Sequence, residues 1–212
     1  MPIKAIIFDM DGVLIDAKEW HYEALNRALG LFGYTISRYD HLVTYDGLPT
    51  KKKLEMLTLE RGLPRALHGF LNELKQIYTN ELIHLKCKPL FHHEYALARL
   101  KQEGFKMAVG SNSIRATIEL MLSKANLLQY FEFTLSNQDV QKSKPDPEIY
   151  QTAIARLGLK PSECLIVEDN EHGIKAATAS GAHVLRVTSP FDVNYENIHA
   201  RVSQLQREPQ PC

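Results

Sequence analysis

The sequence predicts an α/β fold: a parallel sheet with helices on both faces, interrupted after its first strand by a helical domain. From about residue 90 onward, apolar runs of strand length alternate with stretches of helical spacing, the pattern of βαβ units. The runs are continuously apolar, as in strands that are covered on both faces. Residues 17–86, in contrast, show helical spacing and no convincing strand.

The predicted elements of the sheet domain follow from these runs. Five apolar segments are expected to form strands: AIIF (5–8), MAVG (107–110), FEFTL (131–135), CLIV (164–167) and HVLRV (183–187). Four segments with apolar residues three and four positions apart are expected to form helices: 92–103, 114–124, 147–157 and 171–180.

The inserted block contains three amphipathic stretches, at 20–33, 49–62 and 67–83. We therefore expect two domains: an α/β core from residues 1–16 plus 87–212, and a helical domain from residues 17–86. An insertion directly after the first strand is expected at the carboxyl edge of the sheet, where open α/β sheets bind ligands. The helical domain is thus predicted to be a movable lid over a site.

The composition limits the classes of partner. The 212 residues include 25 Lys and Arg and 25 Asp and Glu, so the balanced charge gives no argument for nucleic acid or a membrane surface. No apolar run reaches the length of a membrane span. Three scattered cysteines, Cys87, Cys164 and Cys212, do not indicate a disulfide framework. We expect a cytoplasmic protein that is a monomer or a weak homodimer.

Polar side chains gather where the predicted strands end. The carboxyl ends of parallel strands lie at one edge of a sheet, so residues far apart in the sequence are expected to converge there. The clusters are Asp9 and Asp11 after the first strand, Ser111 to Ser113 after the second, Lys142 to Lys144 after the third, and Glu168 and Asp169 after the fourth.

The residue types in these clusters predict phosphoryl transfer. Asp9, Asp11, Glu168 and Asp169 would repel one another unless a cation lay between them. Mg²⁺ prefers carboxylate oxygens and leaves positions open for a substrate phosphate. Lys144 adds a positive charge suited to a phosphate oxygen or to the nucleophile.

Ser111 offers a hydroxyl and a neighbouring backbone N–H at the start of a helix, where anions bind. Asp9 is the predicted nucleophile, because a carboxylate can attack phosphorus and form an aspartyl-phosphate. Asp11, two residues on, is placed to protonate the leaving oxygen and later to deprotonate a water. Gly12 permits the tight backbone that such a loop needs.

Four segments, FDMDGVLID, VGSNS, SKPDPEIY and IVEDNEHGIKAATASGA, resemble in order the four motifs of the haloacid dehalogenase superfamily. The helical insertion resembles the C1 cap of its subfamily I, in the branch of β-phosphoglucomutase and related phosphatases. The resemblance implies a Rossmann-like core with an inserted helical cap.

The resemblance also implies roles at the matching positions of the core. Asp9 is the nucleophile and Asp11 the acid/base, which also offers its backbone carbonyl to the metal. Ser111 and Lys144 bind the phosphoryl group, and Asn112 lies near it. Asp169 is implied as a Mg²⁺ ligand. For Glu168, direct ligation and a supporting position behind the ligands both remain open.

Two further substrate-binding candidates lie in the cap. His21 resembles the cap-hinge histidine of β-phosphoglucomutase. Thr50 stands where the mutase has an arginine that grips a second phosphate, and the adjacent Lys51 is the candidate to replace it. The dehalogenases of the superfamily lack an aspartate two residues after the nucleophile, so Asp11 favours phosphate ester chemistry.

The predicted activity is a Mg²⁺-dependent phosphatase that acts on a small phosphorylated metabolite through an aspartyl-phosphate. One alternative is a phosphomutase like β-phosphoglucomutase, which keeps the phosphoryl group on Asp9 until a second sugar hydroxyl arrives. The other is a catalytically silent binding module, against which the intact set of Asp9, Asp11, Lys144 and Asp169 argues.

Overall fold

The computed structural model describes residues 2–207, and the chain divides into two compact units. One unit consists of the residues up to Asp16 and from Lys88 onward, and the other of Ala17–Cys87. Because the first unit is built from two separate stretches of chain, the second is an insertion within it.

The first unit contains the predicted parallel sheet. Its strands are β1 (Ala5–Phe8), β2 (Lys106–Gly110), β3 (Phe133–Leu135), β4 (Cys164–Glu168) and β5 (His183–Arg186). They lie in the order β3-β2-β1-β4-β5, and every neighbouring pair is parallel. The central strand β1 pairs with β2 and β4, so Ala5 is opposite both Lys106 and Cys164. The prediction of a parallel α/β sheet is confirmed.

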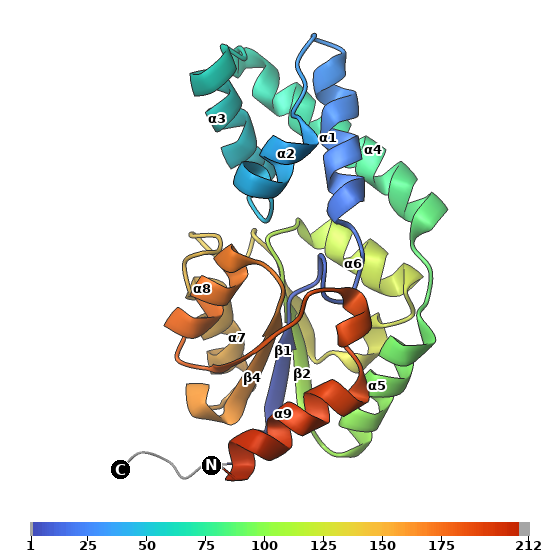
Figure 1. Cartoon of the computed structure of the whole chain (residues 1–212), viewed down its shortest axis with the longest axis vertical. Coiled ribbons are helices and arrows are strands. Elements are labelled where there is room, and N and C mark those ends of the chain that lie inside the picture. Colours follow the sequence, from blue (N-terminus) through green and yellow to red (C-terminus); the bar gives the residue numbers. More distant parts are fainter. Residues whose placement is uncertain (1, 208–212) are drawn as a thin grey trace. The chain divides into compact units, whose positions relative to one another are not determined.

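Helices cover both faces of this sheet (Figure 1). The helices α7 (Glu148–Leu157) and α8 (Glu171–Ala179) lie on one face. On the other face lie α5 (Phe91–Gln102), α6 (Arg115–Lys124) and α9 (Tyr195–Arg207). Short 3₁₀ turns connect these elements: η3 (Leu128–Tyr130), η4 (Pro161–Glu163) and η5 (Pro190–Asp192).

The core of this unit explains the continuous apolar strands. All four residues of β1 are fully buried, because one face packs on α7 and α8 and the other on the opposite helical layer. Tyr150 and Ile149 of α7 and Ala176 and Ala177 of α8 pack with the sheet in one cluster.

The second unit is helical throughout. It contains α1 (Lys18–Gly30), α2 (Arg38–Asp40) with a π turn η1 (His41–Tyr45), α3 (Thr50–Arg61), the 3₁₀ turn η2 (Arg65–Leu67) and α4 (His68–Lys86). Its core joins apolar residues of these elements, among them Leu29, Tyr45, Leu57 and Leu71. Gly62 ends α3 in the left-handed conformation, with φ of +70°.

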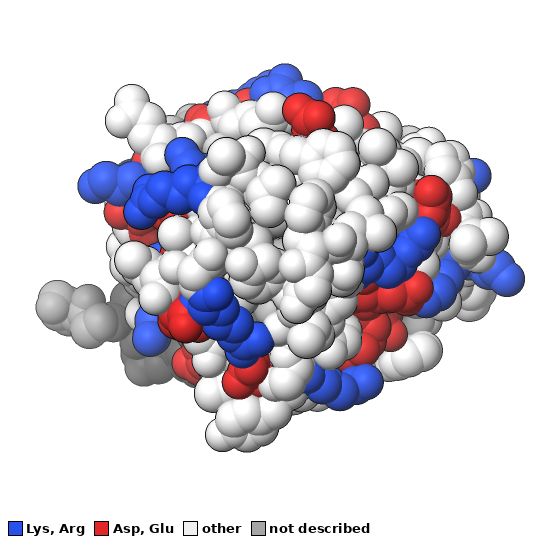
Figure 2. Space-filling model, turned by 90° about the horizontal axis from the view of Figure 1, so that it is seen from above, with Lys and Arg blue, Asp and Glu red and all other residues white. Residues whose placement is uncertain are grey.

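Three further features concern the surface, the helices and the cysteines. The face drawn in Figure 2 mixes positive and negative side chains around a broad uncharged area, and no single sign dominates it. Among the described residues, no helix is long and apolar enough to cross a membrane. Cys87 and Cys164 are buried free thiols, and Cys212 lies outside the described residues.

Candidate active site

The polar clusters at the strand ends meet within the first unit. Asp9 directly follows β1, Ser111 follows β2, and Glu168 is the last residue of β4. Lys144 lies in the segment between β3 and α7. The convergence of these residues follows from the parallel sheet, which brings the carboxyl ends of β1, β2 and β4 side by side.

Lys144 joins two of the buried carboxylates. Its Nζ donates to Asp9 Oδ1 at 2.6 Å and to Glu168 Oε1 at 2.7 Å. Only 4% of Asp9, 4% of Lys144 and none of Glu168 is exposed. Water does not screen ion pairs at this depth, and the surrounding packing fixes their geometry.

A metal-capable cluster overlaps this ion pair. Carboxylate oxygens of Asp9, Glu168 and Asp169 all lie within 4.8 Å of one another. Such a set of hard oxygen donors fits Mg²⁺. The carboxylate of Asp11 is not part of this group among the described residues, and its side chain is engaged elsewhere.

The surroundings change the protonation of the central pair. Burial raises the pKa of Asp9 well above its ordinary value; Lys144 opposes this, and Glu168, Asp169 and Asp11 add to it. Burial lowers the pKa of Lys144, but Asp9 and Glu168 outweigh that effect and raise it overall. Lys144 therefore stays protonated.

Asp11 lies in a tight turn that directly follows β1. Met10 O accepts the backbone N–H groups of Val13, Leu14 and Ile15 at 3.3, 2.9 and 2.9 Å. Gly12 has φ of +89°, a conformation that favours glycine, as the sequence predicted for this position.

A hydrogen bond then fixes the Asp11 carboxylate. Ser113 Oγ donates to Asp11 Oδ2 at 2.8 Å. Ser113 belongs to the second of the predicted polar clusters, but the sequence does not indicate its role. We infer that Ser113 orients Asp11, the predicted acid/base.

We expect Ser113→Ala to lower kcat by about three- to tenfold, because Asp11 loses the donor that orients it. Steady-state kinetics on an active phosphate ester will measure this. Ser123→Ala, at an exposed position on α6, is the control and should leave kcat unchanged. Equal kcat values in the two variants would contradict an orienting role.

Ser111 and Asn112 form the turn after β2. Ser111 is buried, and its Oγ accepts the Ser113 N–H at 3.1 Å, which leaves its own hydroxyl proton available to an acceptor. Asn112 Oδ1 accepts the Lys144 N–H at 3.1 Å, so its side chain fixes the Lys144 backbone. The helix α6 begins only at Arg115, so these residues lie in a loop and not at the helix start that we expected.

The cap candidates lie in different surroundings within their own unit. His21 Nδ1 is 3.1 Å from Lys75 Nζ, and Lys75 is buried. Lys51 is exposed near the beginning of α3, whereas Lys53 on the same helix is buried. His41 is also buried, and burial followed by the nearby Lys53 lowers its pKa.

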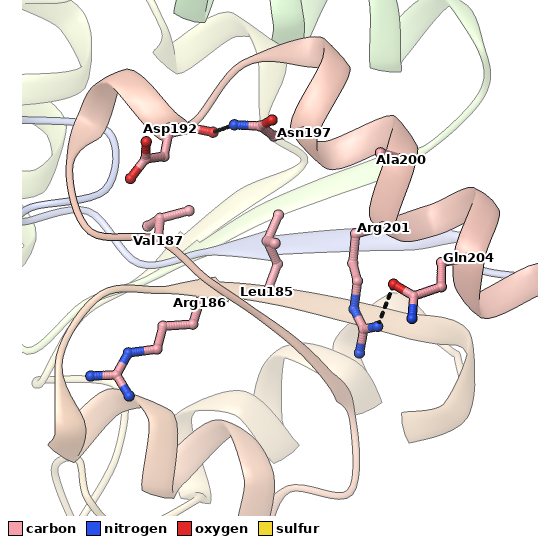
Figure 3. A pocket seen from close by; sticks show the side chains of 8 residues that line it. All are labelled: Leu185, Arg186, Val187, Asp192, Asn197, Ala200, Arg201 and Gln204. Carbon is pink, nitrogen blue, oxygen red and sulfur yellow. Dashed lines mark hydrogen bonds between the residues drawn. The ribbon is translucent and has the colours of Figure 1, made fainter.

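A cavity of about 360 Å³ lies in the first unit. It opens between β5 and α9, and none of the predicted site residues lines it (Figure 3). Its charged groups are engaged locally: Arg201 donates to Gln204 Oε1 at 3.0 Å, and Arg186 pairs with Glu171 at 2.7 Å.

The chain is similar in sequence to a family of hydrolases and to individual phosphatases. The sequence profile of haloacid dehalogenase-like hydrolases matches residues 6–187. The phosphorylated carbohydrates phosphatase of Thermotoga maritima is 30% identical over 184 residues, which are 84% of this chain and 82% of that protein. Fructose-1-phosphate phosphatase YqaB of Escherichia coli is 27% identical over 185 residues, covering 86% and 95% of the two chains.

A solved structure shares the fold. The crystal structure of β-phosphoglucomutase from Clostridium difficile superposes with a TM-score of 0.83 and covers 97% of this chain and 100% of that chain. The two are 22% identical in sequence, so this similarity concerns the fold alone.

Proposed function

Because the chain belongs to the haloacid dehalogenase-like hydrolases, we propose that it is a Mg²⁺-dependent phosphatase with Asp9 as the nucleophile. The observation that carries the proposal is the buried contact of 2.6 Å between Asp9 and Lys144, beside the carboxylates of Glu168 and Asp169. The names of the relatives support a small phosphorylated metabolite, and a phosphorylated sugar first, as the substrate.

In the first step, an Asp9 carboxylate oxygen attacks phosphorus, and the bond from phosphorus to the ester oxygen breaks. Asp11 transfers its proton to that leaving oxygen. In the second step, Asp11 takes a proton from water, whose oxygen attacks the phosphorus. Inorganic phosphate leaves, and the Asp9 carboxylate is restored.

The other site residues bind the transferring phosphoryl group and neutralise its negative charge. Lys144 and the Ser111 hydroxyl hold oxygens of the transferring group, and Asn112 keeps Lys144 in place through the Lys144 backbone. Asp9, Glu168 and Asp169 are the side chains that would hold Mg²⁺, together with the backbone carbonyl of Asp11. Bound Mg²⁺ supplies positive charge that favours ionised Asp9 and offsets its repulsion from the phosphate.

The test is a screen of the purified protein with Mg²⁺ against phosphorylated sugars, nucleotides and short acids, with released phosphate as the readout. Phosphate release that EDTA stops and Mg²⁺ restores is the expected result. No release from any member of the panel, in a protein that is folded by circular dichroism, would argue for the silent binding module.

A phosphomutase is the second candidate, and one cap observation favours it. His21 Nδ1 lies 3.1 Å from Lys75 Nζ. His21 resembles the cap-hinge histidine of β-phosphoglucomutase, and Lys75 resembles, more loosely, another cap lysine of that enzyme. In this reading His21 and Lys51 bind substrate. A coupled assay with β-glucose 1-phosphate and a bisphosphate primer separates the candidates, because conversion to the 6-phosphate without phosphate release occurs only in a mutase.

We expect Asp11→Asn to lower kcat by about 10²–10⁴-fold, because asparagine cannot give or take the proton. Rapid quenching with ³²P-labelled substrate should show phosphoenzyme accumulating, since the step that needs a base is slowed. A rate equal to that of the parent would remove Asp11 from the acid/base role.

A further inference from the structure

One tyrosine contacts the ion pair at the centre of the site. Tyr150 lies in the first turn of α7 and is fully buried. Its hydroxyl donates to Glu168 Oε1 at 2.6 Å, the same oxygen that accepts Lys144 Nζ at 2.7 Å. Lys144 Nζ also lies 4.7 Å from the centroid of the Tyr150 ring. Tyr150 therefore contacts both Glu168 and Lys144.

Two further contacts help to fix the Glu168 carboxylate. Its Oε2 accepts the Asp169 N–H at 3.0 Å. On the side of α8, a Cβ atom at Gly173 would be 1.8 Å from Oε1, so the carboxylate fills the space that this glycine leaves open. Glu168 is thus held by donors on both oxygens and by packing.

The direction of the Tyr150 contact is also fixed. The Tyr150 hydroxyl is the donor and the Glu168 carboxylate oxygen is the acceptor. A protonated hydroxyl beside a carboxylate can only donate to it. The hydroxyl and the Lys144 ammonium thus share Glu168 Oε1 from two fixed directions.

We propose that Tyr150 is a positioning residue for phosphoryl transfer: through Glu168 it holds the Lys144 ammonium against Asp9. This inference rests on the proposed function. Charges that stabilise a transition state act best when they are already in place, and a displacement of one ångström is costly. Without the hydroxyl, Glu168 Oε1 loses one of the two donors described above, and the Lys144 ammonium is held less firmly against Asp9.

The test is Tyr150→Phe, which removes one oxygen and keeps the ring in the core. We expect kcat to fall by about tenfold, with KM within twofold of the parent, because the lost contact acts on the transition state. Inhibition by orthovanadate, which mimics that state, should weaken by a similar factor.

Tyr45→Phe is the matched control, because Tyr45 is also buried and its hydroxyl donates to Glu60 at 2.8 Å in the cap unit. Both variants lose a hydrogen bond from a buried tyrosine to a glutamate, and because Glu60 is exposed whereas Glu168 is buried, Tyr45→Phe should lower the melting temperature no more than Tyr150→Phe does. Only Tyr150→Phe should lose kcat and vanadate affinity.

A double-mutant cycle with Glu168→Gln tests the route of the effect. If Tyr150 acts through Glu168, then Tyr150→Phe should lower kcat less than twofold in the Glu168→Gln background. Full additivity, a parent-like kcat in Tyr150→Phe, or a loss confined to KM would overturn the inference.

A readout that needs no turnover separates this inference from the proposed function. Orthovanadate with Mg²⁺ should raise the melting temperature of the parent more than that of Tyr150→Phe. A parent that neither hydrolyses phosphate esters nor responds to vanadate would overturn the proposed function. A parent that does both, with Tyr150→Phe indistinguishable from it, would overturn only the positioning role.

Discussion

Asp9→Asn is expected to lower turnover by about 10⁴-fold or more, because an amide cannot form the acyl phosphate. The substitution keeps the shape of the side chain, and its Oδ1 can still accept the Lys144 ammonium. Labelled substrate should leave no acid-stable phosphate on the variant protein, whereas the parent should be labelled. Turnover at a tenth of the parent rate or more would rule out Asp9 as the nucleophile.

The same variant should be more stable than the parent at neutral pH in EDTA. The pKa of Asp9 is raised in the folded protein above its ordinary value of 3.8. Below that value Asp9 is protonated in both the folded and unfolded states, so parent and variant should unfold alike. As the pH rises, the unfolded state ionises first, and the parent loses stability relative to Asp9→Asn.

Melting temperatures of both proteins between pH 4 and pH 8 measure this difference. A gap that widens as the pH rises is the expected result. A gap that narrows would mean that the ion pair with Lys144 outweighs the burial of Asp9.

Lys144→Ala is expected to impair both activity and stability. It removes the positive charge that contacts Asp9 and Glu168, so we expect kcat to fall by at least about 10³-fold. The two carboxylates would remain buried without this partner, at a cost of about 3–5 kcal/mol in the free energy of unfolding. Urea denaturation and steady-state kinetics measure the two effects.

Lys142→Ala is the control from the same loop. The Lys142 side chain is 74% exposed and lies 3.8 Å from Asp146, a surface pair that contributes little. We expect kcat within twofold of the parent and unfolding free energy within about 0.5 kcal/mol. Comparable losses in both variants would assign the effect to the loop and not to the Lys144 ammonium.

The sheet could be predicted from the sequence because each strand carries its own signal. Burial on both faces makes β1, residues 107–110 of β2 and residues 164–167 of β4 continuously apolar. The strand boundaries are harder to predict. The third strand was expected over 131–135, but β3 covers only Phe133–Leu135, although the Glu132 N–H still donates to Met107 O at 2.8 Å. The helix α9 was not predicted, although Ile198, Val202 and Leu205 are spaced for one buried face.

The candidate site was predictable to the extent that strand ends determine it. The order of the strands brings Asp9, Lys144 and Glu168 together without any knowledge of side-chain conformation. The roles of Ser113 and Tyr150 could not be predicted, because each depends on one hydrogen bond between residues 102 and 18 positions apart. The neighbouring motif residues indicate where the site lies. The hydrogen-bond partners of Ser113 and Tyr150 follow only from the three-dimensional structure.

The order of the strands along the chain also affects how the protein folds while it is being synthesised. The strand β1, which leads into Asp9, is synthesised before its two neighbours in the sheet, which begin at Lys106 and Cys164. Such distant pairings slow folding, because long segments must be ordered before the contacts form. During synthesis this apolar strand therefore does not have both of its neighbours until residue 168 has been made, and an unpaired apolar strand favours aggregation.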